Sequence, residues 1–456
     1  MGLQTRLPFE IDQEVDESLL TAHAGIPLLM ELYRASGVAD VVDARCSVKQ
    51  RKRGLSAAEM LESLLTLWVA GGERCEDLER LREDRALAHL LGHDLPAPQT
   101  AREFLESFHE DTLPLWQGPE GSAVPTESEP LAGLAEANAR LIRFVQTHRT
   151  ESRATLDVDA TILESDKRAA KPTYKGGKGY QPVSVLWAEQ DLILAEEFRD
   201  GNVPAGSGNL RVVDKALANL PQGVEQIQLR GDSALYELAL MSRLEQRKVG
   251  FAISAPMNST LKIEIEALPE EAWREDGPEA DAVRQWAEVS YVPSDLRGDK
   301  HASAPYRYLA IRILKKQGSF FADGTDRRHF AIVTNRPGDG LELIRWHRGK
   351  AGTIEHVHDI LTNELAAEAL PSQKFGANAA WHRMNALLYN LLSALKRVAL
   401  PGEFSQARPK RLRFLIFNTI GKVIRHARET LLRLVSPLSR DLADALRVKI
   451  HALAGV

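Results

Sequence analysis

Three acidic residues, far apart along the chain, combine a residue type and a setting that suit metal-dependent chemistry. Asp159 stands in LDVDAT, Asp232 in LRGDSALY, and Glu355 in AGTIEHVHDIL. The two aspartates end short apolar runs that predict buried strands, and the glutamate lies in a segment with helical periodicity. Converging carboxylates repel one another unless a cation neutralises them, and Mg²⁺ is a hard cation that prefers oxygen ligands. We therefore expect phosphoryl transfer that depends on a divalent metal.

The separation of these acids means that only the fold can bring them together. Asp232 follows Asp159 by 73 residues, and Glu355 follows after a further 123. Such intervals exclude a local metal loop of the EF-hand kind. Asp157 is the alternative to Asp159, because alternation along a strand puts both side chains on one face. Asp159 is favoured as the ligand, since it stands where the strand meets a loop.

The composition is that of a globular protein with several structural units. The chain has 456 residues, of which 44% are hydrophobic and 27% charged. Such a length predicts roughly two to four units. No apolar run approaches the roughly 20 residues that cross a bilayer, and the start of the sequence lacks the pattern of a secretory signal. Cys46 and Cys75 provide no disulfide framework. We expect no membrane segment and a cytoplasmic location.

Charge is distributed unevenly along the chain. The net charge is −5, yet residues 401–456 contain eleven Lys or Arg and only four acids. Such an excess of cations suits a polyphosphate surface, because each neutralised phosphate releases counterions. A solvated helix face is an equally good interpretation from charge alone.

Residues 1–133 predict a helical region that ends in a linker. Apolar helical stretches alternate with polar breaks between about residues 18 and 113, and Ser56 with Glu59 has the pattern of a capping box. LPAPQTAREFLESFHED places Pro and Gln-Thr before an amphipathic helix, as in helix-turn-helix units, although many ordinary helices begin this way. We interpret this part as a DNA-binding region. Residues 114–133 are rich in Pro, Gly, Ser and Glu, which is typical of a linker or a long loop.

The remainder of the chain predicts an α/β core with an insertion. Residues 134–255 contain, in order, a helix, three strands, a helix, a strand, a helix and a strand, which indicates a mixed α+β sheet rather than a Rossmann alternation. Residues 256–335 predict an insertion that is largely β after a loop-rich start, with Trp273 and Trp286 in its interior. Residues 336–400 return to helix, and residues 401–456 form a basic C-terminal segment.

Four motifs occur in sequence over roughly residues 150–435: LDVDAT, LRGDSALYE, HRGKAGTIEHVHDILTNEL and PSQKFGANAAWHRMNALLYNLLSALKR. In combination they resemble a DDE transposase of the IS1380 group, which is IS4-like. The resemblance implies a ribonuclease-H-like core in which Asp159, Asp232 and Glu355 bind two Mg²⁺ ions, or Mn²⁺ in their place. A β-rich insertion is implied between the second aspartate and the glutamate.

The same resemblance implies what the protein does. It would cut the ends of a mobile element and catalyse strand transfer, with two metal ions stabilising the attacking and leaving oxygens. Its partners would be terminal inverted repeats and target DNA. It would act as a homodimer on DNA, associated with the nucleoid when bound.

Several cations are candidates for contacts to DNA phosphates. They lie after the first aspartate, ahead of the glutamate and in the C-terminal segment: Lys175, Lys178, Arg348, Lys350, Arg411 and Arg413. Related transposases carry Tyr, Arg and Lys at set offsets around the glutamate, whereas here Arg348 precedes Glu355 by seven residues and Thr362 follows it by seven. The alternative interpretation of these cations is that they are ordinary solvated charges.

Two other functions compete with this interpretation. LDVDATIL matches the D-x-D-x-T opening of a haloacid-dehalogenase-type phosphatase, with Asp157 as the nucleophile and Asp159 as the acid. That match fails downstream, because Tyr236 stands where a further acid is favoured and Ser254 follows Asp232 instead of preceding it. The second alternative is a DNA-binding protein that derives from a transposase and has lost catalysis.

Overall fold

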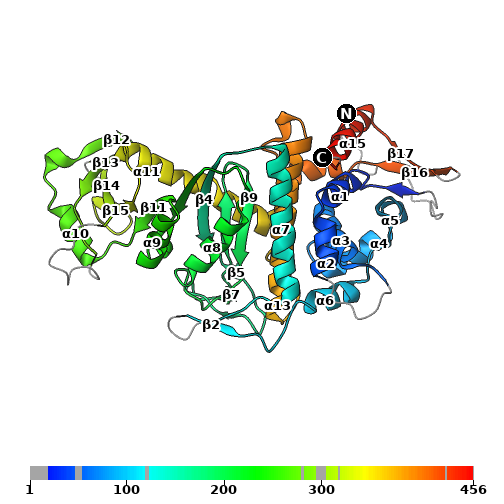
Figure 1. Ribbon diagram of the computed structural model, residues 1–456, viewed down its shortest axis with the longest axis horizontal. Coiled ribbons are helices and arrows are strands. Elements are labelled where there is room, and N and C mark those ends of the chain that lie inside the picture. The colour runs from blue at the N-terminus through cyan, green and yellow to red at the C-terminus, as the bar shows by residue number, and fades with distance from the viewer. Residues whose placement is uncertain are drawn as a thin grey trace, which may run out of the picture.

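A single mixed sheet organises the central part of the molecule. The computed structural model describes residues 19–46, 54–118, 123–278, 282–293, 305–316, 319–426 and 429–454. Figure 1 shows an elongated molecule, with the insertion strands at one end and the N-terminal helices at the other. The sheet has nine strands in the order β12-β13-β14-β15-β11-β10-β4-β8-β9.

Five of these strands form the core. They are β4 (Arg153–Ala160), β8 (Val183–Trp187), β9 (Leu192–Glu197), β10 (Gln226–Gly231) and β11 (Gly250–Ala255). β4, β8 and β9 are joined in antiparallel succession, whereas β10 pairs parallel to β4 and β11 parallel to β10. This arrangement is a ribonuclease-H-like core, and it confirms the expected mixed sheet.

Helices cover these strands, which explains why their apolar runs are continuous instead of alternating with polar residues. The helices are α7 (Glu129–His148), α8 (Asn209–Asn219), α9 (Leu238–Gln246), α11 (Gly340–Arg348), α12 (Ile354–Glu364) and α13 (Phe375–Ala394). α7, α8 and α13 contact β9, and α12 contacts β4. Every residue of β8 and β9 is buried, which is typical of strands that are covered on both faces.

The insertion continues the core sheet instead of forming a separate one. Its elements are α10 (Ser259–Glu266), β12 (Arg274–Pro278), β13 (Ala282–Val289), β14 (Arg307–Lys315) and β15 (Arg327–Thr334). β15 pairs antiparallel with β11, so the hydrogen-bonded ladder runs unbroken from the core into the insertion. The loop-rich start that we expected is wrong for residues 259–266, because Asn258 caps a helix there through Leu261 N–H. Trp273 and Trp286 are buried, as predicted.

The N-terminal part is helical, as predicted. Its helices are α1 (Ile26–Ala35), α2 (Val38–Arg45), α3 (Ala57–Ala70), α4 (Leu78–Arg82), α5 (Arg85–Leu91) and α6 (Pro98–Glu106). Ser56 and Glu59 form the capping box at the start of α3, with each side chain accepting from the other residue's backbone N–H. A short strand, β1 (Leu20–Thr21), precedes these helices.

The predicted linker is shorter than residues 114–133. β2 (Leu115–Gln117) and β3 (Ala123–Pro125) pair antiparallel within it. α7 then begins at Glu129, ahead of the expected start at residue 134, because Ser128 accepts from Leu131 N–H and Pro130 lies in the first turn. A second small sheet joins β5 (Leu163–Glu164), β6 (Lys171–Pro172) and β7 (Lys178–Tyr180) beyond the end of β4.

The C-terminal segment folds back onto the N-terminal helices. It contains α14 (Pro409–Leu412), β16 (Gly421–His426), β17 (Glu429–Leu434) and α15 (Pro437–Ala454). β1 pairs with β16 in a three-stranded sheet of order β1-β16-β17, and α15 contacts α1. Gly25 makes the junction close: a Cβ there would lie 1.9 Å from the backbone oxygen of Ile416. Within the described residues, no helix is both long and apolar enough to span a membrane.

Candidate active site

Two neighbouring parallel strands carry Asp159 and Asp232 to the same edge of the sheet. In the ladder, Arg230 lies opposite Asp157, and Gly231 lies opposite Val158. Asp159 follows Val158 within β4, and Asp232 is the first residue after the end of β10. The two aspartates, which are distant in sequence, thus both lie at the carboxyl ends of the paired strands β4 and β10.

Asp157 is locked into the protein interior. Its side chain is fully buried, and the Arg230 guanidinium donates to both carboxylate oxygens, at 2.6 Å and 2.7 Å. The Thr353 hydroxyl donates to Oδ2 of the same carboxylate. Arg230 also donates to the backbone oxygen of Trp346 at 2.6 Å. These bonds tie the ends of β4 and β10 to α11 and to the segment between α11 and α12, so Asp157 has a structural role.

Asp159 retains a partly accessible carboxylate that faces two basic side chains. Nζ of Lys350 donates to Oδ1 at 3.1 Å, and Nδ1 of His358 lies 3.7 Å from Oδ2. Burial lowers the pKa of His358 to about 4, although the Asp159 carboxylate acts in the opposite direction. The imidazole is therefore neutral near pH 7, and the positive charge that faces Asp159 comes from Lys350.

Asp232 is exposed just beyond the end of β10. Its Oδ1 accepts from the backbone N–H of Ala234 at 2.9 Å, which caps a short 3₁₀ turn, Ser233–Leu235. The residue lines a groove of about 560 Å³ that runs onto the insertion strands and also includes Phe330 and Arg348. The carboxylate thus stands between the core edge and an open surface that is large enough for a ligand.

Glu355 lies in the first turn of α12, and its side chain is exposed. α12 contacts β4. His358, which faces Asp159, follows Glu355 by three residues on this helix. Residues three apart on a helix are neighbours on its surface. Glu355 is therefore a helix neighbour of the residue that faces Asp159.

The residue types at this edge fit a divalent metal, because three carboxylates provide the oxygen ligands that Mg²⁺ prefers. The structure brings their elements together but does not bring the side chains to ligand spacing. In the part of the chain that the structure describes, no group of three His, Cys, Asp or Glu side chains could hold a metal ion. In place of a metal ion, the Lys350 ammonium contacts one oxygen of Asp159 and balances the negative charge of that carboxylate.

The candidate DNA-binding cations fall into two groups. Lys175, Lys178 and Arg411 are exposed, and no ion pair of theirs occurs among the described residues. The other three have protein partners: Lys350 is bound to Asp159, Arg348 Nη2 lies 2.5 Å from Asp276 Oδ2, and Arg413 donates to the backbone oxygens of Trp68 and Val69.

The sequence analysis missed three residues of this site: Arg230, Thr353 and His358. A signal for Arg230 was present, because it precedes Asp232 by two residues just as Asp157 precedes Asp159. On adjacent strands this spacing repeats a charged position on one face. His358 lies one helical turn after Glu355, and its ring faces Asp159.

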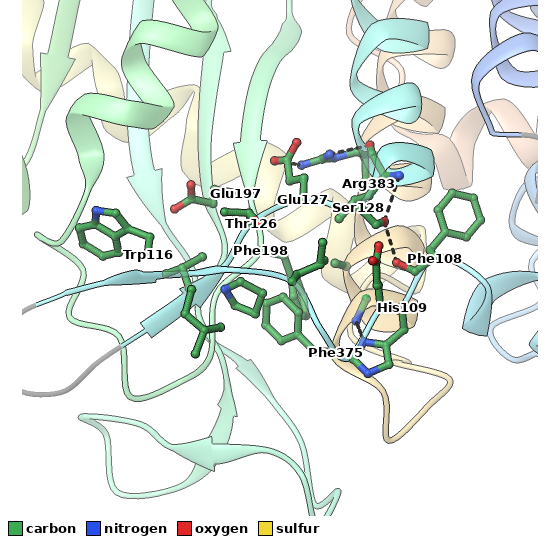
Figure 2. A pocket seen from close by; sticks show the side chains of 18 of the residues that line it. Phe108, His109, Trp116, Thr126, Glu127, Ser128, Glu197, Phe198, Phe375 and Arg383 are labelled. Carbon is green, nitrogen blue, oxygen red and sulfur yellow. Dashed lines mark hydrogen bonds and ion pairs between the residues drawn. The ribbon is translucent and has the colours of Figure 1, made fainter.

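A separate cavity of about 280 Å³ lies under the β2–β3 hairpin, next to the end of β9 (Figure 2). Beside it, the buried Arg383 donates to Glu127 at 3.0 Å and to Glu196 at 2.6 Å. Burial acts to raise the pKa of Glu127, but Arg383 and Lys215 outweigh it and lower that pKa to about 2. The ion pairs of Arg383 thus join α13 to β9 and to the segment just before α7.

Known proteins resemble this chain in sequence and, more weakly, in structure. The family described as transposase DDE domain group 1 matches residues 9–451. No curated protein matches at a significant level. A solved structure, the cryo-EM structure of a piggyBac transposase synaptic complex with hairpin DNA, is similar with a TM-score of 0.44 and 12% identity, over 85% of this chain and 78% of that chain. The match over residues 9–451 shows that the chain belongs to the transposase DDE domain group 1 family.

Proposed function

We propose that this transposase cuts DNA at the ends of its element and transfers the cut strands to a target, using Asp159, Asp232 and Glu355. One observation supports the proposal: Asp159 ends β4 and Asp232 follows β10, which pairs parallel with β4 up to Gly231 and Val158, and α12, which bears Glu355, contacts β4. Two aspartates and a glutamate at one edge of a ribonuclease-H-like sheet suit two-metal phosphoryl transfer. The finer assignment to the IS1380 group, and the use of Mg²⁺ or Mn²⁺, are part of the proposal.

Asp159, Asp232 and Glu355 would hold the metal ions, which supply charge stabilisation for the attacking and leaving oxygens when bound. The remaining residues position these ligands. Arg230 and Thr353 fix Asp157, and through it the end of β4, so that Asp159 projects at a defined place. Lys350 donates to one oxygen of the Asp159 carboxylate. Once that bond is broken, the lysine would be free to contact a phosphate.

Asp157 argues against the phosphatase alternative. A haloacid-dehalogenase-type enzyme needs this aspartate as an accessible nucleophile that attacks phosphorus. Here the side chain has no exposed surface and both of its oxygens accept from Arg230. An incoming phosphate has no path to it.

The decisive experiment combines cleavage and binding on DNA that contains the element's own ends. We expect Asp159→Ala, Asp232→Ala and Glu355→Ala each to abolish metal-dependent cleavage while leaving DNA binding within about twofold of wild type. Asp166→Ala, which changes an exposed acid close to Asp159 in sequence, serves as the matched control and should cut normally. Cleavage retained by one of the three variants would remove that residue from the site. DNA binding by wild type without any cleavage would instead select the non-catalytic alternative.

Lys175, Lys178 and Arg411 are the cations that we propose for DNA phosphates, because their side chains are exposed and have no protein ion pair in the described ranges. Each phosphate contact contributes about 0.9 to the slope of log affinity against log salt. Replacing one of these cations by alanine should therefore lower the slope by about that amount. An unchanged slope would show that the side chain is an ordinary solvated charge and does not contact a DNA phosphate. Arg413→Ala should act on stability instead, because its guanidinium is bound to backbone oxygens.

A further inference from the structure

The strand β17 presents an open edge. It is the last strand of the sheet β1-β16-β17, and Figure 1 shows the β16–β17 hairpin extending past the N-terminal helices. An exposed edge strand carries unpaired backbone N–H and C=O groups and is a template for pairing with another strand. Charged side chains such as Glu429 and Arg433 limit pairing with arbitrary strands, so a partner for this edge must match their charges.

The hydrogen-bond pattern shows which backbone groups of β17 are free. Val435 N–H donates to the Ile420 oxygen at 3.4 Å, in the same register that pairs Leu431 with Ile424. Antiparallel ladders alternate between residues that bond the neighbour and residues that point away. Residues 429, 431, 433 and 435 therefore bond β16, and Thr430 and Leu432 direct their backbone groups to the open edge.

The outer face of this small sheet carries exposed apolar side chains beside Lys422 and Arg433. Exposed side chains gather there from all three strands and their ends: Leu20 (46%), Ile420 (55%), Leu431 (52%) and Val435 (70%). The register places them on one face, because Leu20 lies opposite Lys422, and Lys422 lies opposite Arg433. Exposed apolar groups in a cluster mark an interaction surface more often than scattered ones do.

We propose that a second copy of this chain pairs with β17 antiparallel, about a twofold axis at Leu431. In that register Thr430 faces Leu432 of the second copy, so the free backbone groups of both edges bond each other. The same register brings Glu429 opposite Arg433, once on each side of the axis. Opposite charges in directly facing positions stabilise a strand pair.

The charges favour this register and a copy of the same chain. Glu429 and Arg433 are exposed, and neither has an ion-pair partner among the described residues. Arg433 instead faces another cation, Lys422, across the ladder, so an incoming glutamate relieves a like-charge pair. A twofold axis at Arg433 would place arginine against arginine, and one at Leu432 would place Leu431 against Arg433. Only a self-complementary strand satisfies both charges under twofold symmetry.

Charge reversal tests the pairing directly, with the full chain and analytical ultracentrifugation. Wild type is expected to sediment as a dimer. Glu429→Arg places arginines opposite each other and Arg433→Glu places glutamates opposite each other, so each variant alone should lose the dimer at concentrations where wild type keeps it. Mixed in equal amounts, the two variants restore both opposite-charge pairs and should form a heterodimer. Circular dichroism shows whether each variant remains folded.

A proline substitution tests the open edge without relying on charge. Thr430→Pro removes an N–H that points away from β16, so it should abolish the dimer while leaving the ladder to β16 intact. Thr430→Val is the matched control: like the proline variant it loses the hydroxyl that lies 3.2 Å from His89 Nε2, but it keeps the N–H and should stay dimeric.

Each contrary result overturns the proposal. These results are a monomeric wild type, single charge variants that dimerise like wild type, a mixture that fails to associate, and a dimeric Thr430→Pro variant. The inference goes beyond the proposed function, because it concerns assembly and needs no cleavage. Loss of catalysis in the Asp159, Asp232 or Glu355 variants leaves it untouched.

Discussion

Nζ of Lys350 lies 3.1 Å from Oδ1 of Asp159, so a lysine holds the carboxylate that we assign to metal binding. Both side chains are largely buried, at 11% and 17% exposure. An ion pair with so little solvent around it is screened less than a surface pair. A metal ion that binds Asp159 must therefore compete with this ammonium for the negative charge of the carboxylate.

Replacing Lys350 should strengthen metal binding. Lys350→Met removes the competing cation and leaves Asp159 without charge compensation. We expect Mn²⁺ affinity to rise about tenfold, which corresponds to about 1.4 kcal/mol. Electron paramagnetic resonance of free Mn²⁺ measures this affinity without any need for DNA cleavage.

The exposed Lys175 provides the matched control, and Lys175→Met should leave Mn²⁺ affinity unchanged. Equal affinities for wild type and Lys350→Met would show that the lysine does not compete for Asp159. No Mn²⁺ binding by either protein would instead count against the metal site itself.

Asp157 and Asp159 should differ sharply in their effect on stability. Asp157→Ala leaves the buried Arg230 guanidinium unpaired, which costs about 3–5 kcal/mol. Asp159→Ala removes a partly accessible group and should cost much less. Urea denaturation followed by fluorescence compares the two variants with wild type.

Removing both partners of the buried pair provides a second check. Asp157→Leu combined with Arg230→Met should be less destabilising than Asp157→Ala alone, because no unpaired charge remains. Equal losses for Asp157→Ala and Asp159→Ala would contradict the structural role that we give to Asp157.

Gly25 tests the packing of the C-terminal segment against the N-terminal helices. Gly25→Ala would place a Cβ 1.9 Å from the backbone oxygen of Ile416, so the backbone must shift at a cost of about 1–3 kcal/mol. The melting temperature should fall, and limited proteolysis should cleave faster near residue 416. Gly402→Ala is the control, because a Cβ there meets no atom within 4 Å. Similar melting temperatures for the two variants would argue against the close approach.

Glu127 should contribute stability that depends on pH. Its pKa is lowered from 4.5 to about 2 in the folded protein, so the stabilisation is complete above pH 4.5 and is lost as the pH falls toward 2. The stability difference between wild type and Glu127→Gln should therefore be largest near neutral pH, at most about 3 kcal/mol. It should shrink below pH 4.5.

Urea titrations at a series of pH values measure this difference. The neighbouring exposed Glu129 provides the control, and Glu129→Gln should follow wild type throughout. A difference between wild type and Glu127→Gln that stays constant from pH 7 to pH 3 would show that the Arg383 network does not hold Glu127 as described.

The core was predictable because its strands have a recognisable sequence pattern. β4 and β8–β11 are short apolar runs bounded by polar turns, and a strand that is buried on both faces leaves that pattern in any sequence. The positions of Asp159 and Asp232 at strand ends follow from the same pattern. Local chemistry also fixed the start of α3, since the capping box of Ser56 and Glu59 involves only neighbouring residues.

Features that depend on distant partners were not predictable. The pairing of β15 with β11 joins Thr334 to Ala252. Nothing in the sequence of either strand indicates which strand it pairs with. The same holds for β1 with β16, near opposite ends of the chain. The bond between Lys350 and Asp159 depends on the 3₁₀ turn Gly349–Gly352 that presents the lysine, and no periodicity reveals such a turn.

The continuity of the nine-stranded sheet has a mechanical consequence. Because β15 is bonded directly to β11, the insertion cannot swing independently of the edge that carries Asp159 and Asp232. A ligand bound on β13–β15 is therefore held at a fixed distance and orientation relative to those carboxylates. Reorienting it requires either bending the sheet or moving an element that packs on the sheet without being one of its strands, such as α12 with Glu355.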